Sequence, residues 1–205
     1  MSKKKRVILK AATILFAEKG FNETSTAELA RITNSAEGTI FYHFKNKTEL
    51  FLAVLEGVRE GILHEFEQYI ENRHFETGLE MMEEVIAFFL YLAGHKQEWF
   101  LLIQRYYPYE LARVNDECRN HLEAIYNTLL DLFEGAILRG QADGSVRKLS
   151  SKKMALILFS MVNGVTWLRF HDLYESGPRA EDCLYLKIVG RRLDFKCEHT
   201  ITRPQ

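Results

Sequence analysis

The sequence is poor in residues that interrupt helices or cross-link chains. It has only three prolines and three cysteines among 205 residues. Cys118, Cys183 and Cys197 are odd in number and far apart, a pattern that favours neither a disulfide framework nor a zinc knuckle. We interpret them as structural residues of a protein that stays in a reducing compartment, and therefore expect a cytoplasmic location.

The sequence also lacks a segment for export or membrane insertion. Its longest apolar run, residues 154–168, is interrupted by Asn163 and followed by Arg169, whereas a membrane-spanning helix needs about 18 uninterrupted apolar residues. The basic N-terminus is followed by Lys10 and Glu18, where a signal peptide would have an apolar core. We therefore expect no secretory signal and no membrane partner.

No motif in the sequence identifies an enzyme. A glycine-rich phosphate loop, an HExxH motif and a Gly-x-Ser-x-Gly elbow are all missing. Glu71 and His74 match one half of the paired Glu-x-x-His motif of di-iron helix bundles, but no second copy occurs. We expect no enzymatic activity, no metal and no cofactor. The other alternative function is that of a helical adaptor, a protein that binds only other proteins.

What the sequence does have is an uneven distribution of charge. Residues 1–47 contain nine lysines and arginines against four glutamates, and the remainder contains 18 basic against 24 acidic residues. The net charge is therefore +5 on residues 1–47 and −6 on the rest. Such an asymmetry is typical of a protein whose N-terminal part binds a polyanion, although a solvated lysine-rich terminus gives the same charge.

Three short helices are predicted in this basic part. Apolar residues repeat with helical spacing over residues 3–19, and Gly20 follows where a helix would end. Ser25 and Glu28 have the spacing of a capping box, in which the glutamate reaches back to the start of the helix. That helix extends to about Thr33, and a third covers residues 38–44. The arrangement predicts a helix-turn-helix, whose later helix enters the major groove of DNA.

Residues 20–51, GFNETSTAELARITNSAEGTIFYHFKNKTELF, make this prediction more specific. They combine a glycine after the first helix, a Ser-Thr start of the second, a Gly-Thr-aliphatic-aromatic third helix, a Tyr-His-Phe close and a lysine that opens a fourth helix. The segment resembles the DNA-binding signature of the TetR family of transcription regulators. The rest of the chain resembles that family only in length and helical pattern.

The resemblance implies two kinds of DNA contact. Hydroxyls, helix amides and lysines position a protein on phosphates, whereas side chains that face the groove read bases. The residues implied to contact phosphates are Thr26, Tyr42 and Lys47, with Ser25 beside them as a further predicted DNA contact. The residues implied to face base edges or nearby backbone are Glu37, Gly38, Thr39 and His43. We interpret Ile40, Phe41 and Phe44 as the apolar side of the same helix.

The third helix departs from the family pattern in two places. The serine that many members have just before this helix is displaced to Ser35, and Phe41 stands where many have tyrosine. A phosphate contact is thereby lost. Glu37 has the same sign of charge as phosphate, but a carboxylate is favourable at a helix N-terminus and can accept from cytosine. We expect Glu37 to specify bases rather than to add affinity.

The remaining residues predict about six helices and no strand. Helical patterns cover residues 48–71, 78–94, 97–107, 109–138, 152–174 and 180–193. We expect Gly140 to stop the fourth of these and Ser150 or Ser151 to cap the fifth. The predicted fold is all-α, with a three-helix helix-turn-helix domain at residues 1–47. A helical-bundle effector-binding and dimerisation domain follows at residues 48–205.

The family resemblance implies an effector cavity in the body, and polar residues within apolar helices are its best sequence markers. Most aromatic residues of the body are expected to be ordinary core. The candidate effector-binding residues are Phe89, Trp99, Gln104, Tyr126, Asn127, Asn163, Trp167 and His171. We expect a small and largely apolar effector that releases the protein from its operator.

The resemblance also implies a homodimer, formed by the last two helices. Because one helix-turn-helix reads only a few base pairs, the partner is expected to be double-stranded operator DNA with a near-palindromic sequence. The apolar row Leu158, Val162, Val165 and Leu168, with Gly164 for close approach, is suited to the dimer interface. We expect a repressor, although repression and activation depend on where the operator lies.

Overall fold

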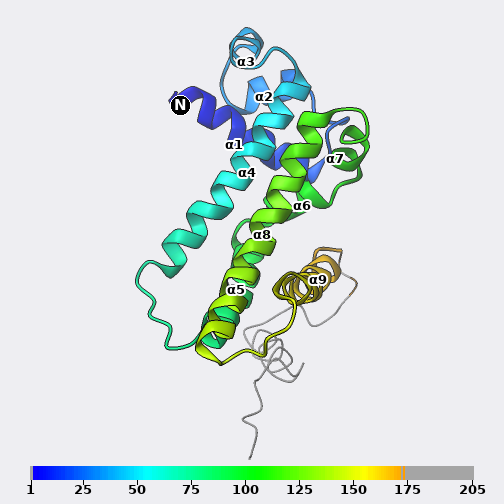
Figure 1. The fold of residues 1–205 in the computed structure, drawn as a ribbon. Coiled ribbons are helices and arrows are strands. Elements are labelled where there is room, and N and C mark those ends of the chain that lie inside the picture. Colours follow the sequence, from blue (N-terminus) through cyan, green and yellow to red (C-terminus); the bar gives the residue numbers. More distant parts are fainter. Residues whose placement is uncertain (1, 172, 174–205) are drawn as a thin grey trace, which may run out of the picture. The chain divides into compact units, whose positions relative to one another are not determined.

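The computed structural model describes residues 2–171 and 173, which form α-helices joined by turns (Figure 1). The helices are α1 (Lys3–Glu18), α2 (Thr26–Ile32), α3 (Glu37–His43), α4 (Lys47–Ile70), α5 (Gly78–His95), α6 (Gln97–Gln104), α7 (Tyr106–Leu111), α8 (Asp116–Asp143) and α9 (Ser151–Phe170). The described residues contain no strand, and the predicted all-α fold with an N-terminal helix-turn-helix is confirmed. The helix predicted at residues 180–193 lies outside the described residues, as do Cys183 and Cys197.

The chain divides by packing into two compact units. The first contains Met1–Glu67 and Leu92–Asn127, and the second contains Gln68–Tyr91 and the described residues from Thr128 onward. The helices α4, α5 and α8 contribute residues to both units. This division describes packing within the chain and does not test the predicted functional boundary after Lys47.

An aromatic cluster forms the centre of the first unit. The ring of Phe51 in α4 makes edge contacts with Phe16 of α1 and with Phe21, each with ring centroids 5.5 Å apart. Phe21 also stacks on Tyr107 of α7, with centroids 3.9 Å apart and planes inclined by 6°. The cluster therefore joins the helix-turn-helix to α4 and α7 within one unit.

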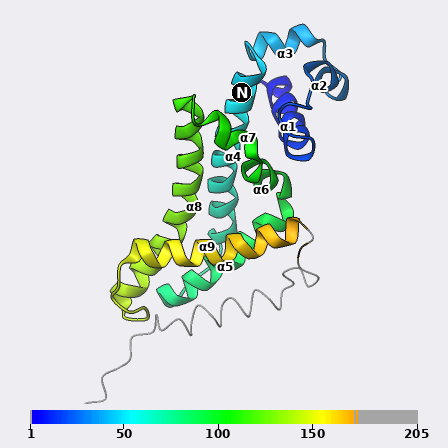
Figure 2. The same ribbon diagram turned by 90° about the vertical axis from the view of Figure 1, so that its right-hand side faces the viewer.

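The second unit is built on close packing among α5, α8 and α9. Phe89 of α5 contacts Phe133 of α8 and Phe159 of α9, and Figure 2 shows α9 passing over α5. A Cβ atom on Gly78, at the start of α5, would lie 2.0 Å from the backbone nitrogen of Gly140. Only glycine fits at this contact, because any side chain would overlap the backbone of α8.

Two predicted helix boundaries in the body are wrong. Gly140 does not stop a helix, since α8 continues to Asp143 and the left-handed Gly144, at φ 81°, follows it. Gly140 serves close helix packing instead. The helix predicted to begin near Tyr109 is divided into α7 and α8, because the Asn115 side chain accepts from the Cys118 amide at 2.8 Å and begins a new helix there.

Candidate nucleic-acid interface

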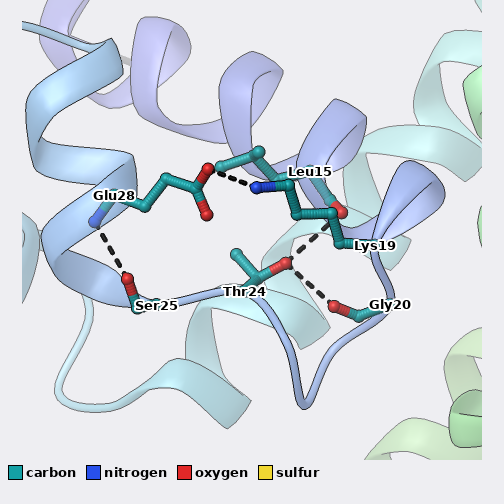
Figure 3. Close-up of polar contacts among 6 residues, drawn as sticks. All are labelled: Leu15, Lys19, Gly20, Thr24, Ser25 and Glu28. Atoms are coloured by element: carbon teal, nitrogen blue, oxygen red, sulfur yellow. Dashed lines mark hydrogen bonds and ion pairs between the residues drawn. The ribbon is translucent and has the colours of Figure 1, made fainter.

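A network of short polar contacts fixes α2 against the end of α1 (Figure 3). The buried Thr24 hydroxyl donates to the carbonyls of Gly20, at 2.8 Å, and Leu15, at 3.3 Å. Ser25 then caps α2 by accepting from the Glu28 amide at 3.0 Å. The Thr24 hydroxyl thus adds a second bond to the Leu15 carbonyl, which also accepts from the Lys19 amide at 2.9 Å, and one to the Gly20 carbonyl just after α1.

The second half of the predicted capping box is wrong. The Glu28 carboxylate does not reach back to the start of α2, because it forms an ion pair with Lys19 at the end of α1 (Figure 3). The glutamate therefore ties two helices together, whereas a capping box would have stabilised one. Only the serine capping bond follows from the local sequence pattern.

A tight turn connects α2 to α3. Asn34 adopts a left-handed conformation with φ 47°, which asparagine tolerates better than most residues. The buried Thr33 hydroxyl donates to the Leu29 carbonyl at 2.8 Å, and the Ser35 amide donates to the Ala30 carbonyl at 2.9 Å. The turn satisfies its own polar groups, so the start of α3 has a fixed position relative to α2.

The helix α3 is anchored on one side and open on the other. Ile40 and Phe44 are 1% and 2% exposed, and their four-residue spacing places them on one face. Glu37, Gly38 and Tyr42 are exposed, Tyr42 by 84%, and Thr39 and His43 are partly exposed. Core roles for Ile40 and Phe44 are thus confirmed. Phe41 is 46% exposed, so its predicted place on the apolar side is wrong.

Two residues predicted to contact DNA bind each other in this structure. The Thr26 hydroxyl at the start of α2 donates to the Glu37 carboxylate at the start of α3, at 3.1 Å. A hydroxyl has one proton to donate, and a phosphate oxygen accepts but does not donate. A phosphate contact from Thr26 therefore requires that its hydroxyl leaves Glu37, which frees the carboxylate to face the bases.

Lys47 begins α4 and lies against the link between α1 and α2. Its ammonium donates to the Asn22 carbonyl at 3.3 Å and lies 4.4 Å from the centre of the Phe21 ring. Partial burial lowers the pKa of Lys47, and Glu23 opposes that shift. Phe21 is the ring that stacks on Tyr107 of α7, so Lys47 is connected to α7 through one aromatic side chain.

Two lysines that no sequence motif singled out pack against the helix-turn-helix. The Lys4 ammonium donates to the Asn34 carbonyl in the turn before α3, at 3.0 Å, and the Lys5 ammonium lies 5.2 Å from the Phe44 ring centre. Their positive charge is evident from the sequence. Their position beside the helix-turn-helix is not, because it depends on how α1 packs against the turn between α2 and α3.

The candidate effector-binding residues are divided between the two units. Trp99, Gln104, Tyr126 and Asn127 belong to the first unit, and Phe89, Asn163, Trp167 and His171 belong to the second. Their effector-binding role stays a prediction. In the first unit, Trp99 lies directly over Gly61 of α4. The Tyr126 hydroxyl is hydrogen-bonded to that of Tyr109, and burial raises the pKa of Tyr126.

The second-unit candidates lie in different surroundings. Phe89 is fully buried in the aromatic core, Asn163 is partly exposed, and Trp167 and His171 are exposed and stacked with ring centres 4.4 Å apart. The apolar row proposed for dimerisation is wrong in part, since Leu158 and Val162 are 2% and 1% exposed. The apolar residues that α9 leaves exposed are Leu156, Ile157, Trp167 and Leu168.

Two further observations concern the half-matched di-iron motif and membrane-spanning helices. Glu71 and His74 follow the end of α4 at Ile70, so they do not share a helical face as a di-iron motif requires. None of the helices in the described part of the chain is long and apolar enough to cross a membrane.

Comparison with known proteins identifies the helix-turn-helix. Residues 8–54 match the sequence model of the family described as "Bacterial regulatory proteins, tetR family". Residues 8–54 are thus similar to the DNA-binding domain of TetR-family transcription regulators. TetR regulators bind operator DNA as dimers and respond to small-molecule effectors.

Relatives of the TetR family extend the match to most of the chain. The fatty acid metabolism regulator protein of Bacillus subtilis is 22% identical over 186 residues, which cover 89% of this chain and 93% of that protein. The transcriptional regulator QacR of Staphylococcus aureus is 25% identical over 166 residues, which cover 77% of this chain and 81% of that protein.

Solved TetR structures have the same fold. A tetR-family regulatory protein from Rhodococcus aligns with a TM-score of 0.73 at 21% identity, covering 96% of this chain and 99% of that one. The regulator FadR of Bacillus subtilis, solved in complex with stearoyl-CoA, aligns with a TM-score of 0.69 at 22% identity, covering 90% of this chain and 98% of that one. At these identities the likeness concerns the fold alone.

Proposed function

We propose that this TetR-family protein is a homodimeric repressor with a DNA-binding domain at residues 1–47 and an effector-binding and dimerisation domain at 48–205. The exposed face of α3 carries the DNA-binding part of the proposal. Ile40 and Phe44 are buried and anchor the opposite face of that helix. The side chains of Glu37, Thr39 and His43 are therefore available to read bases in the major groove.

The phosphate contacts come from residues around the edge of that helix. Tyr42 is 84% exposed, and Thr26 and Lys47 lie at the starts of α2 and α4. Ser25 is proposed to contribute through the backbone at the start of α2, because its side chain already accepts from the Glu28 amide. On DNA, we expect the Thr26 hydroxyl to exchange Glu37 for a phosphate, and the Lys47 ammonium to exchange the Asn22 carbonyl for another.

The DNA-binding proposal is tested by selecting preferred sequences from randomised duplexes with the purified protein. Replacing Lys47 by alanine should weaken binding to all duplexes and reduce the slope of log K against log salt by about one unit, because one phosphate contact is lost. Thr39→Ala should change the selected bases instead. Lys148→Ala, an exposed lysine in the second unit, is the matched control. An unchanged salt slope for Lys47→Ala would contradict the phosphate contact.

We further propose that effector binding acts on the DNA-binding domain through Arg105, between α6 and α7. Its guanidinium donates two bonds to the Ala17 carbonyl, at 2.7 and 3.0 Å, and one to the Glu18 carbonyl, at 2.6 Å. Both carbonyls are at the C-terminal end of α1. Two residues further on, Tyr107 stacks on Phe21, against which Lys47 rests. A shift of α6 and α7 would therefore move α1 and change the position of Lys47.

The effector is proposed to be small and largely apolar. Support comes from the relatives, since one is a fatty acid metabolism regulator and one solved structure contains stearoyl-CoA. Stearoyl-CoA is thus a suitable first probe, read out by tryptophan fluorescence and by release of the selected operator. Coupling is reciprocal, so operator DNA must weaken effector binding by the factor by which effector weakens operator binding. A ligand that binds tightly without changing operator affinity would contradict the coupling.

The proposal assigns no enzymatic activity to the chain. The relatives are transcription regulators, and regulation needs only binding and a change of shape. Because the matched family is one of bacterial regulatory proteins, and bacterial DNA lies in the cytoplasm, the protein is proposed to act there.

A further inference from the structure

The amide group of one side chain in the first unit is buried and has no polar partner among the described residues. Gln104 is the last residue of α6, and both atoms of its amide group are buried and form no hydrogen bond with any residue in the described part of the chain. The amide has two protons to donate and an oxygen that accepts. Two apolar residues of the same helix are buried beside it, since Phe100, one helical turn earlier, is 1% exposed and Ile103 is 2% exposed.

Gln104 differs in this respect from other buried polar residues. Thr13, Thr24, Thr33 and Thr166 each donate to a backbone carbonyl within 2.9 Å. These threonines are satisfied because a hydroxyl next to the backbone finds a carbonyl of its own or a neighbouring turn. The longer glutamine side chain carries its amide away from such carbonyls. An unpaired buried amide destabilises the folded protein, so its presence indicates a partner beyond the residues that the structure describes.

The residue that follows Gln104 connects this position to the end of α1. Arg105 follows it directly and binds the Ala17 and Glu18 carbonyls at the end of α1. One peptide bond therefore separates a buried unpaired amide from the residue that holds the DNA-binding part. A ligand that draws the Gln104 amide toward itself would pull on the same backbone that positions the Arg105 guanidinium.

We propose that Gln104 recognises a carboxamide-type group on the effector and that this contact loosens the Arg105 bonds to α1. The inference rests on the proposed repressor function and names the chemistry that its effector site reads. A group with a carbonyl oxygen and an N–H in one plane pairs with both ends of the glutamine amide. A carboxylate would satisfy the amide protons but face the Gln104 oxygen with negative charge, and an ester offers no proton to it. The effector is therefore an apolar chain that carries an amide.

Three probes with the same hydrocarbon chain separate these possibilities: decanamide, decanoate and methyl decanoate. Binding is measured by tryptophan fluorescence, and release by competition with a selected operator duplex. We expect the wild type to bind decanamide at least tenfold more tightly than the other two, and to lose operator affinity when decanamide binds. Equal binding of all three probes, or no binding of decanamide, would overturn the proposal.

The variant Gln104→Leu tests the role of the residue itself. We expect a higher midpoint of thermal unfolding without ligand, unchanged operator affinity, and at least a tenfold loss of decanamide binding with methyl decanoate unaffected. Gln97→Leu is the matched control, because Gln97 is exposed at the start of the same helix. It should leave decanamide binding unchanged. A lower unfolding midpoint for Gln104→Leu, with decanamide binding preserved, would make Gln104 a structural residue and overturn the inference.

The outcome also separates this inference from the proposed function. If the wild type binds no duplex in a salt-sensitive manner, the repressor proposal fails irrespective of the probes. If stearoyl-CoA releases the operator equally well from wild type and Gln104→Leu, the repressor proposal stands and the assignment of Gln104 fails.

Discussion

Both units of this protein combine aromatic packing with polar contacts, and they differ in how closely their backbones approach one another. In the first, polar contacts link separate elements around an aromatic cluster: Arg105 binds the end of α1, Thr24 donates to Leu15 of α1, and Lys47 lies against Phe21. In the second, backbones meet closely at Gly78 and Gly140, and Phe89, Phe133 and Phe159 form an apolar core. Hydrogen bonds to exposed carbonyls can be exchanged for bonds to water, whereas close packing cannot be exchanged without a cavity or an overlap.

This difference suits a regulator. The first unit contains the predicted DNA contacts and the candidate link to the effector, and several of the contacts between its helices are hydrogen bonds that can be exchanged at small cost. The second unit offers a fixed packing arrangement that resists rearrangement. We therefore expect substitutions in the second unit to act mainly on stability, and those at the polar contacts of the first unit to act on operator affinity and its response to effector.

The largest effect is expected at the glycine contact of the second unit. Gly78→Ala should lower the free energy of unfolding by about 3 kcal/mol, because its Cβ would overlap the backbone of α8 and a helix must move. Gly135→Ala, at a site on α8 with no atom near the added Cβ, should raise stability by about 1 kcal/mol through helix propensity. Denaturant unfolding of both variants measures the difference. Equal stabilities would mean that the α5–α8 contact adapts freely.

A smaller effect on stability and a larger one on regulation are expected at Arg105. Arg105→Met retains the aliphatic stem but removes three hydrogen bonds to the end of α1, which should cost about 2 kcal/mol. Because the link to α6 and α7 is lost, effector should release operator less well while binding as before. Arg113→Met, an exposed arginine after α7, should change neither property. Full effector response in Arg105→Met would show that another contact carries the coupling.

Substitutions of two buried threonines, one in each unit, allow the two units to be compared directly. Thr24→Val removes a hydroxyl that joins α2 to α1, and should cost about 1 kcal/mol of stability. In the second unit, Thr166→Val removes a bond to Val162 within the same helix, and should cost less because it joins no separate elements. Thr24→Val should also weaken operator binding, which gel-shift titration measures. A larger loss from Thr166→Val would reverse the proposed contrast.

The smallest effect is expected from Asp143, which closes the turn after α8. Its carboxylate accepts from the Ser145 amide at 2.8 Å and from the Gly78 amide at 2.6 Å, and bonds with Ser145 lower its pKa below 3.8. A lowered pKa means that its contribution to stability is present above pH 3.8 and is lost as the pH falls below that value. Asp143→Asn should flatten this part of the stability profile, whereas Asp131→Asn on the same helix should not. Parallel profiles for wild type and Asp143→Asn would contradict the assignment.

Local signals predicted the N-terminal helices well and the body less well. Gly20, Ser25 and the 40 and 44 positions act within one or two helical turns, so their roles follow from spacing alone. Three of the wrong predictions involve contacts between separate segments: Glu28 pairs with Lys19, Gly140 meets Gly78, and Leu158 faces the core. In each case the residue type fits the role that was expected from the local sequence. The residue instead contacts another segment, and the sequence pattern does not show which segments meet.

By itself, the sequence determined that the chain is helical, that its basic N-terminal part contains a helix-turn-helix, and that this part resembles a family of regulators. Helical periodicity, capping residues and a charge asymmetry are short-range properties, and they can be read without knowing which segments meet. Only the tertiary structure decided that Thr26 faces Glu37, that Arg105 binds the end of α1, and that the Gln104 amide is buried without a partner among the described residues. Each of these depends on side chains from separate helices being brought together, or kept apart, by the packing of the whole unit.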